Sequence, residues 1–438
     1  MERAEGTPEL HFEPANTDDA EAVARLWCDA FPGDRTVAQR VRTLETGGRY
    51  GGIETVCTAR DGRGELAGAC KAYRMVEYIA GAPMPMMGLA AVAVAPSFRR
   101  RGVGARLCSE VIRASADRGD AVSVLYPFRP AYYERLGWGL VGSLHEHLFR
   151  TAELGPFDAG EGDPVRAASA EIDGPAIADC YQRVTRVANG PIRRDRAVWR
   201  HRLLGEQLGV RPPGEDSLGG KAGDPGLSAV VYDDGGVTGY ALVRYAKASA
   251  PERSTLQVRE LLAENEVAYR GLLAHLASQR DQWPHALHHA RPGERFGDRL
   301  RDPRPPGYRP ARSLYFPTAR VVRGPMLRVL DVASALRLRP LGGGPARYRI
   351  EVRDPQRREN EGPWSVEVGS DGGVEVAPGR AGRADATVET DASTFARIFV
   401  GELGAVEAAR MGRARVDGDP HRVDRAFATE PFWLLDEF

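Results

Sequence analysis

Residues 92–104 read Val92-Ala93-Val94-Ala95-Pro96-Ser97-Phe98-Arg99-Arg100-Arg101-Gly102-Val103-Gly104. The preceding run from Leu89 is apolar, which is typical of a buried strand, and Pro96 ends it. After Arg101 the apolar residues recur at three-to-four spacing, as in a helix. The glycines between strand and helix let backbone N–H groups approach an anion, and the helix directs the positive end of its dipole to the same place. The stretch therefore predicts a strand-to-helix loop that binds a diphosphate.

Arg99, Gly102 and Gly104 stand at the spacing Arg-x-x-Gly-x-Gly directly after this apolar strand. The pattern resembles the acyl-CoA-binding motif of the GNAT N-acetyltransferases. The resemblance implies acetyl-CoA as the co-substrate and places its contacts within this stretch. The residues implied to bind it are Val92, Val94, Arg99, Arg100, Gly102, Val103 and Gly104. The alternative interpretation is an ordinary turn that needs glycine only to bend.

The composition is that of a globular protein of more than one domain. The chain has 438 residues, of which 42% are hydrophobic and 27% are charged. The formal net charge is zero, so we expect no general attraction to nucleic acid or to an anionic membrane. Nearly all the positive charge is arginine, because Lys71, Lys221 and Lys247 are the only lysines.

The cysteines and the apolar runs exclude several other classes of protein. The five cysteines are odd in number and widely spaced, so we expect neither a disulfide framework nor a metal site. His285, His288 and His289 lack the pairing usual for zinc, and we expect them at the surface or in packing. The N-terminus is polar and acidic, unlike a signal peptide, and the longest apolar run, residues 84–96, is too short for a membrane span. We therefore expect a cytoplasmic protein.

Residues 1–150 show the element order of a GNAT domain. Residues 16–31 are typical of a capped amphipathic helix, and residues 53–60 and 66–78 are typical of two paired strands. A further strand is expected over residues 121–126, after the helix that follows Gly102. A helical crossover joins parallel strands, whereas a hairpin is antiparallel, so the sequence predicts a mixed sheet.

A tyrosine after the last of these strands is the expected general acid. Residues 126–139 contain Tyr133 followed by Gly137 and Trp138, and the resemblance to GNAT enzymes implies a tyrosine near the sulfur of CoA at this place. Acetyl transfer expels a thiolate, which a nearby phenol can protonate. The neighbouring Tyr132 is expected only to pack against the sheet.

Residues 151–322 repeat the same order of elements. Strands are expected over residues 163–168, 227–232, 237–245 and 255–262, and helices over residues 173–187 and 266–280. The junction reads Leu262-Ala263-Glu264-Asn265-Glu266-Val267, without glycine and with two carboxylates where a diphosphate would lie. Charge repulsion then predicts a degenerate GNAT domain that binds no CoA.

Residues 323–438 differ from the two preceding units, because short strands and short helices are expected here. The runs at residues 391–395, 401–403 and 414–418 resemble sterol-carrier-protein domains. The predicted fold class is α+β, with an active GNAT domain, a degenerate GNAT domain and a sterol-carrier-like domain in tandem.

This arrangement resembles the Eis (enhanced intracellular survival) acetyltransferases. That resemblance implies a homo-oligomer, a hexamer, whose terminal carboxylate, here that of Phe438, reaches into the first domain and accepts the proton of the amine. An apolar end favours docking of the tail. Substrate contacts are expected from Phe31, Asp34 and Glu437, and the acidic Asp34, Asp436 and Glu437 suit a small polycationic amine such as an aminoglycoside.

Two other functions fit parts of the sequence. The first is acetylation of protein lysines or N-termini by the same GNAT chemistry. The second is a binding protein whose GNAT domains only sense acyl-CoA and whose last domain binds lipid.

Overall fold

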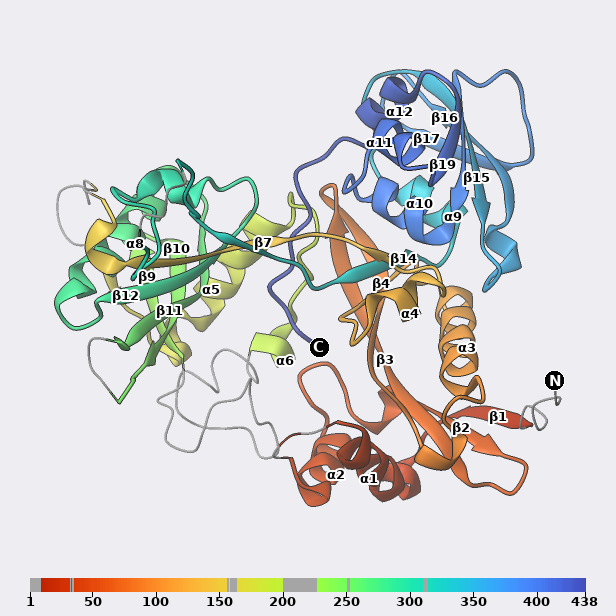
Figure 1. Cartoon of the computed structure of the whole chain (residues 1–438), viewed down its shortest axis with the longest axis horizontal. Coiled ribbons are helices and arrows are strands. Elements are labelled where there is room, and N and C mark those ends of the chain that lie inside the picture. The colour runs from red at the N-terminus through yellow and green to blue at the C-terminus, as the bar shows by residue number, and fades with distance from the viewer. Residues whose placement is uncertain are drawn as a thin grey trace.

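The computed structural model describes residues 9–31, 33, 35–155, 157, 164–199, 227–249, 253–309 and 314–438. Three sheets organise this part of the chain (Figure 1). The first sheet has the order β1-β2-β3-β4-β5-β14-β6, the second β13-β7-β12-β11-β10-β9-β8, and the third β17-β16-β15-β18-β19. None of the helices in the described ranges is long and apolar enough to cross a membrane.

The first sheet has helices on both faces. Its strands are β1 Leu10–Pro14, β2 Val56–Asp61, β3 Leu66–Ile79, β4 Ala82–Val94, β5 Val122–Leu125, β6 Gly139–Leu140 and β14 Met326–Val329. Helix α1 (Ala20–Ala30) packs on one face with Ala69 and Ala93, and α3 (Val103–Asp117) packs on the other with Met87 and Leu89. We call these the α1 face and the α3 face. Only β4 and β5 run parallel, so the predicted mixed sheet is confirmed.

Two elements of the first unit are absent from the sequence-based prediction. The chain forms β1 at its start and α2 (Val37–Thr46) after α1. Helix α2 buries only Thr43 and Leu44, so its apolar periodicity is too weak to reveal it. The expected helix over residues 16–31 is a 3-10 turn, Thr17–Asp19, followed by α1, and Asn16 caps it in a capping box with Asp19.

The second sheet repeats the first. Its strands are β7 Leu144–Arg150, β8 Val165–Ala167, β9 Ser228–Asp233, β10 Val237–Ala246, β11 Thr255–Ala263, β12 His285–Ala290 and β13 Arg320–Val322. Helix α5 (Ala170–Thr185) covers one face and α8 (Glu266–Ser278) the other. The short α6 is Arg196–Val198. Strands β11 and β12 are the parallel pair, in the place that β4 and β5 take in the first sheet.

Two strands cross the domain limits expected at residues 150 and 322. Strand β7 precedes the first limit, yet it pairs with β12 of the second sheet. Strand β14 follows the second limit, yet it lies between β5 and β6 of the first sheet. The three units are therefore interlocked by strand exchange, and the limits stay predictions about sequence units.

The third sheet packs against short helices and shares a core with the first sheet. Its strands are β15 Ala346–Arg353, β16 Gly362–Val368, β17 Val374–Pro378, β18 Ala386–Asp391 and β19 Ala414–Gly418, and its helices are α9 Val332–Leu338, α10 Ala392–Phe399, α11 Ala405–Arg410 and α12 Pro420–Phe427. Tyr348, Phe395 and Phe399 are almost fully buried between sheet and helices, in one core with Met86 and Val124 of the first sheet.

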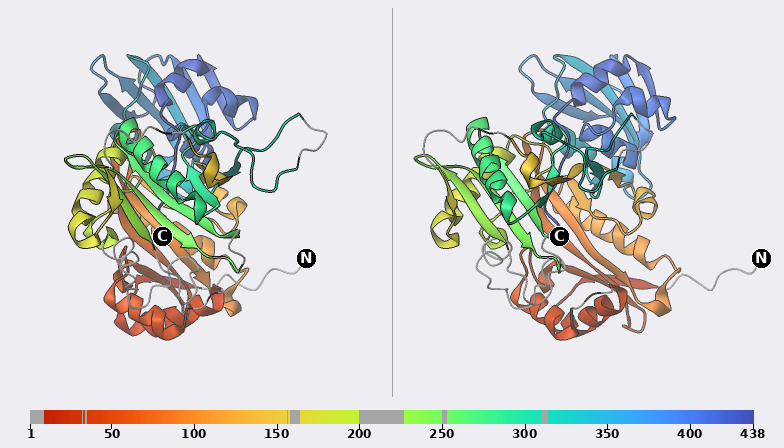
Figure 2. Two further views of the ribbon diagram at one scale, coloured as in Figure 1. Left: turned by 90° about the vertical axis from the view of Figure 1, so that its left-hand side faces the viewer. Right: turned by 60° about the vertical axis from the view of Figure 1, so that its left-hand side comes forward.

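The last eleven residues, 428–438, form neither helix nor strand, and we call them the tail. Figures 1 and 2 show the tail leaving the third unit and running between the other two to end at the centre of the molecule. Phe432, Trp433 and Leu434 are buried. Two glycines permit this path: a Cβ at Gly142 would lie 2.7 Å from the Phe432 ring, and one at Gly190 would lie 2.3 Å from the Trp433 carbonyl oxygen. The predicted docking of the tail is confirmed.

Candidate active site

The loop before α3 has the backbone geometry of an anion site. A 3-10 turn, Pro96–Phe98, ends β4, and then Arg100 and Gly102 take positive φ of 62° and 77°. Such turns direct successive N–H groups to one point, to which the N-terminus of α3 adds its dipole. The side chains of Arg99 and Arg100 are exposed at this point. The loop therefore offers both amides and cations to a diphosphate.

Gly104 allows a close approach in the first turn of α3. A Cβ there would lie 2.9 Å from the Tyr132 hydroxyl and 3.4 Å from Cγ2 of Val94. Tyr132 is half-buried, and its hydroxyl thus lies against the predicted cofactor loop. The expectation that Tyr132 only packs against the sheet misses this position.

Strands β4 and β5 separate in the middle of the first sheet. Their parallel pairing covers Met86 to Leu89 of β4, and beyond Leu89 strand β4 continues without β5. A bulge follows, because Lys71 pairs with Ala90 while Ala69 pairs with Ala93. Ala91 within the bulge has a φ of 50°, and its carbonyl accepts a hydrogen bond of 2.8 Å from Trp27 Nε1. Helix α1 thus holds the bulge in place.

Backbone groups of β4 face the opening between these strands. Ala95 donates to Ala67 of β3 at 3.0 Å, whereas the Val94 carbonyl accepts from Arg99 Nε at 3.2 Å and so points away from β3. Backbone groups alternate along a strand, so Val94 presents its carbonyl to the opening, and Val92 lies in the bulge between the paired residues Ala90 and Ala93. This is the geometry expected for residues that hold an extended acyl chain.

Tyr133 lies on the α3 face, in the core that includes Leu89 and Leu125, the last pair of β4 and β5. It belongs to α4 (Pro130–Glu134), is 4% exposed, and shares a core with Met87, Leu89 and Leu125. Trp138 packs edge-on against its ring. Burial raises the pKa of the Tyr133 phenol above its usual value, so the hydroxyl keeps its proton at neutral pH.

Phe438 lies on the α1 face. Its ring contacts the rings of Tyr50, Tyr73 and Tyr126 at centroid distances of 6.0, 6.4 and 5.8 Å. It also covers Gly88 of β4, where a Cβ would lie 3.0 Å from the Phe438 ring. Gly88 is within the last paired residues of β4 and β5. Tyr133 and Phe438 therefore flank the same end of this strand pair from opposite faces of the sheet.

Asp436 does not face a substrate as the sequence suggested. It is 1% exposed, and its carboxylate pairs with Arg194, which is 7% exposed, at 3.0 Å. Its carbonyl accepts a hydrogen bond of 2.6 Å from the Tyr126 hydroxyl. The expectation of a substrate contact is wrong for Asp436, because burial and pairing use its charge.

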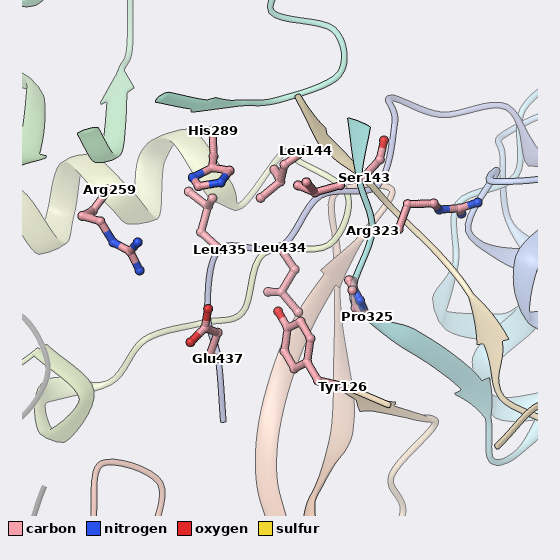
Figure 3. A pocket seen from close by; sticks show the side chains of 12 residues that line it. Tyr126, Ser143, Leu144, Arg259, His289, Arg323, Pro325, Leu434, Leu435 and Glu437 are labelled. Atoms are coloured by element: carbon pink, nitrogen blue, oxygen red, sulfur yellow. The ribbon is translucent and has the colours of Figure 1, made fainter. Parts of the chain in front are cut away.

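The three predicted substrate residues are placed differently. Phe31 ends α1 and packs half-buried against the core of the α1 face. Asp34 lies outside the described residues. Glu437 is exposed and lines a cavity of about 200 Å³ together with Tyr126, Arg259 and His289. Figure 3 shows the tail residues Leu434, Leu435 and Glu437 along one wall of this cavity.

Lys71 is a buried charge next to Tyr73, whose ring contacts Phe438, and sequence analysis did not single it out. It is 8% exposed on β3, and its ammonium lies 5.5 Å from the Trp27 ring centroid and 5.4 Å from that of Tyr73. Cation–π contacts of this kind stabilise a buried charge. The available signal was composition, because a lysine inside an apolar strand is conspicuous in a chain with two others.

The junction before α8 in the second unit differs from the loop before α3 in the first. Asn265 caps α8 through the Ala268 N–H, and Glu266 in the first turn pairs with Arg299 at 2.7 Å. A side-chain oxygen and a carboxylate thus take the place of an anion at this helix N-terminus. His288 is buried and contacts Glu294 at 3.1 Å, as expected for packing. Within the described ranges no group of three or more His, Cys, Asp or Glu side chains could hold a metal ion.

Family comparisons agree with the order of the three units. Two acetyltransferase (GNAT) domain models match residues 11–141 and 190–329, and a sterol carrier protein domain model matches residues 332–435. An uncharacterized N-acetyltransferase of Streptomyces avermitilis is 27% identical over 350 residues, which are 77% of this chain and 76% of the relative. N-acetyltransferase Eis of Mycobacterium tuberculosis is 26% identical over 365 residues, 79% of each chain.

Solved structures share the whole fold. A GCN5-related N-acetyltransferase from Anabaena variabilis superposes with a TM-score of 0.78 at 19% identity, covering 98% of this chain and 100% of that one. Eis1 from Mycobacterium abscessus gives 0.75 at 20% identity with the same coverage. The predicted α+β class and order of units are confirmed. The chain therefore belongs to the GNAT family of N-acetyltransferases, as an Eis-like member with two GNAT domains followed by a sterol-carrier-protein domain.

Proposed function

We propose that this N-acetyltransferase moves the acetyl group of acetyl-CoA directly to a primary amine of a small polycationic molecule such as an aminoglycoside. The observation that carries the proposal is the position of Tyr133 and Phe438 on opposite faces of one strand junction. The loop with Arg99, Arg100 and Gly102 holds the diphosphate, and Val92 and Val94 align the acyl chain.

The proposed chemistry needs one base and one acid. The amine must lose a proton before its nitrogen attacks the thioester carbonyl, because most amines are ammonium ions at neutral pH. The Phe438 carboxylate takes this proton, directly or through water. The carbon–sulfur bond then breaks, and Tyr133 protonates the departing thiolate. The burial that keeps this phenol protonated also raises the proton affinity of a thiolate in the same site.

The charges near Phe438 bear on the substrate. Glu437 is exposed and lines the cavity beside Arg259 and Arg323. Together with the carboxylate of the next residue, Phe438, it supplies negative charge near the end of the chain, which suits a substrate with several amino groups.

The proposal extends to assembly and location. The resemblance to the Eis enzymes predicts a homo-oligomer, a hexamer, and the polar N-terminus and the cysteine pattern predict a cytoplasmic protein. The strongly exposed Leu314 and Tyr315 supply apolar surface for contacts between copies. Sedimentation analysis of the purified chain and cell fractionation test these two points.

The test is a thiol-release assay with acetyl-CoA against aminoglycosides, polyamines and lysine peptides. We expect turnover with the polycationic small molecules and its loss when one glycine is added after Phe438, which moves the carboxylate by about 3.8 Å. Exclusive turnover of lysine peptides would contradict the substrate class. Full activity of the extended chain would refute the terminal base.

A further inference from the structure

The second unit keeps the strand geometry of an acyltransfer site. Its parallel pair β11 and β12 ends at Val258 and His288, and a bulge follows at once, because Val243 pairs with Val258 while Leu242 pairs with Glu260. In the first unit a bulge follows the end of the β4–β5 pairing in the same way. The opening between β11 and β12 thus corresponds to the reaction site of the first unit.

The tail lies at this opening, on the α5 face. Trp433 belongs to the core formed by Tyr181, Leu242 and Leu262, and Leu435 packs against that core. The α5 face corresponds to the α1 face of the first sheet, which carries Phe438. Figure 3 shows Arg259 of the bulge and His289 of β12 beside Leu435 and Glu437. The tail therefore occupies the place where an active second unit would receive its amine substrate.

One buried arginine fixes the tail in this place. Arg194 donates to both oxygens of Asp436 from Nε, at 3.0 and 3.2 Å. Its two terminal nitrogens donate to the Glu260 oxygens at 2.8 and 2.6 Å, and Tyr240 also donates to Glu260. Burial alone would lower the pKa of Arg194, but the two carboxylates outweigh it and raise the pKa. The fork of a guanidinium suits this double pairing, which a lysine could not reproduce.

Asp436, which Arg194 binds, lies two residues before Phe438, whose carboxylate ends the chain. Two residues of extended chain reach at most about 7 Å, so Phe438 has little freedom once Asp436 is fixed. Two side chains of the first unit donate hydrogen bonds to backbone carbonyls of this part of the tail. Tyr126 donates to the Asp436 carbonyl at 2.6 Å, and Arg49 donates to the Glu437 carbonyl.

We propose that the second GNAT unit serves as a receptor for the chain's own tail, in which Arg194, held by Glu260, is a positioning residue for the Phe438 carboxylate. This inference rests on the proposed role of that carboxylate. In this way the second unit, which is expected to bind no CoA itself, would position the base for the reaction in the first unit. Misplacement of a reacting group by about 1 Å can cost about 10²-fold in rate, so loss of the Arg194–Asp436 ion pair should lower kcat.

The test compares Asp436→Asn and Arg194→Met with the unchanged full-length chain. Arg194→Met leaves Glu260 buried without its partner and can impair folding, so Asp436→Asn, which keeps the shape of the side chain, is the decisive variant. Glu264→Gln is the matched control, because it removes the carboxylate of an ion pair with Arg183 in the same unit, a pair that includes no tail residue. Two quantities are measured: kcat and KM for acetyl-CoA, and the rate at which a carboxypeptidase removes Phe438, followed by mass spectrometry.

We expect Asp436→Asn to be trimmed faster than the unchanged chain and the control. Its kcat should fall by about tenfold to about 10²-fold, with KM for acetyl-CoA unchanged because separate residues bind that substrate. Trimming at the rate of the unchanged chain overturns the inference. So does faster trimming with full kcat, if adding a glycine after Phe438 abolishes activity. If the glycine extension is fully active, the proposed base fails, the positioning role fails with it, and the trimming rates report only whether Arg194 holds the tail.

Discussion

Replacing Tyr133 by phenylalanine is the sharpest test of the proposed acid. The substitution removes only the hydroxyl, so the ring contacts with Tyr132, Phe128 and Trp138, at centroid distances of 5.0, 5.7 and 6.0 Å, remain. The stability change should therefore stay within about 1 kcal/mol. Loss of a general acid costs about 10²- to 10⁴-fold, and we expect kcat to fall by at least about 10²-fold.

The assay is initial-rate thiol release over a pH series, with thermal unfolding as the check on folding. Burial raises the pKa of Tyr133 above its ordinary value of about 10. The acid is therefore protonated at neutral pH, and its titration should lower kcat only above about pH 10. In Tyr133→Phe the rate should lack this alkaline fall.

Tyr132→Phe is the matched comparison, since the Tyr132 hydroxyl lies against the first turn of α3. We expect it to raise KM for acetyl-CoA more than it lowers kcat. Full kcat in Tyr133→Phe refutes the assignment. A large loss of kcat in Tyr132→Phe alone would transfer the acid role to Tyr132.

Three further substitutions test the rest of the site. Gly102→Ala meets no atom within 4 Å but forces a side chain into a φ of 77°, so we expect about 1–2 kcal/mol of destabilisation and weaker acetyl-CoA binding in calorimetry. Trp27→Phe removes the 2.8 Å hydrogen bond to the Ala91 carbonyl; we expect about 1 kcal/mol lower stability in denaturant unfolding, and an unchanged kcat would show that the bulge needs no support from α1. Gly88→Ala would place a methyl group 2.8 Å from Met75 Sδ and 3.0 Å from the Phe438 ring, so both side chains must shift, and steady-state kinetics should show a lower kcat with acetyl-CoA binding intact.

Much of the first unit could be predicted from local sequence. The diphosphate loop is a continuous stretch in which a strand, a proline, two glycines and a helix succeed one another, and each of these effects is local. The same holds for Tyr133, which follows β5 closely. Helix α2 and strand β1 escaped prediction because their burial comes from neighbours distant in sequence, not from a periodic apolar pattern of their own.

The charged residues show the limit of such prediction. Asp436 was expected to face a substrate, and its burial against Arg194 depends on a partner 242 residues away. Lys71 is conspicuous as a lysine inside an apolar strand, but only the fold places it over Trp27 and Tyr73. Whether a charged side chain is exposed or is buried against a partner depends on which distant residues the fold brings around it, so it cannot be read from the local sequence.

The sequence by itself determined the strand-to-helix loop before α3, the order of the three units and the apolar character of the tail, because backbone conformation and periodicity are encoded locally. The tertiary structure alone decided that β7 and β14 exchange between sheets and that the tail passes between the first and second units to reach Gly88. Only contacts between distant residues select among the many surfaces that an apolar tail could cover. Here a buried ion pair and two close-packed glycines make that choice.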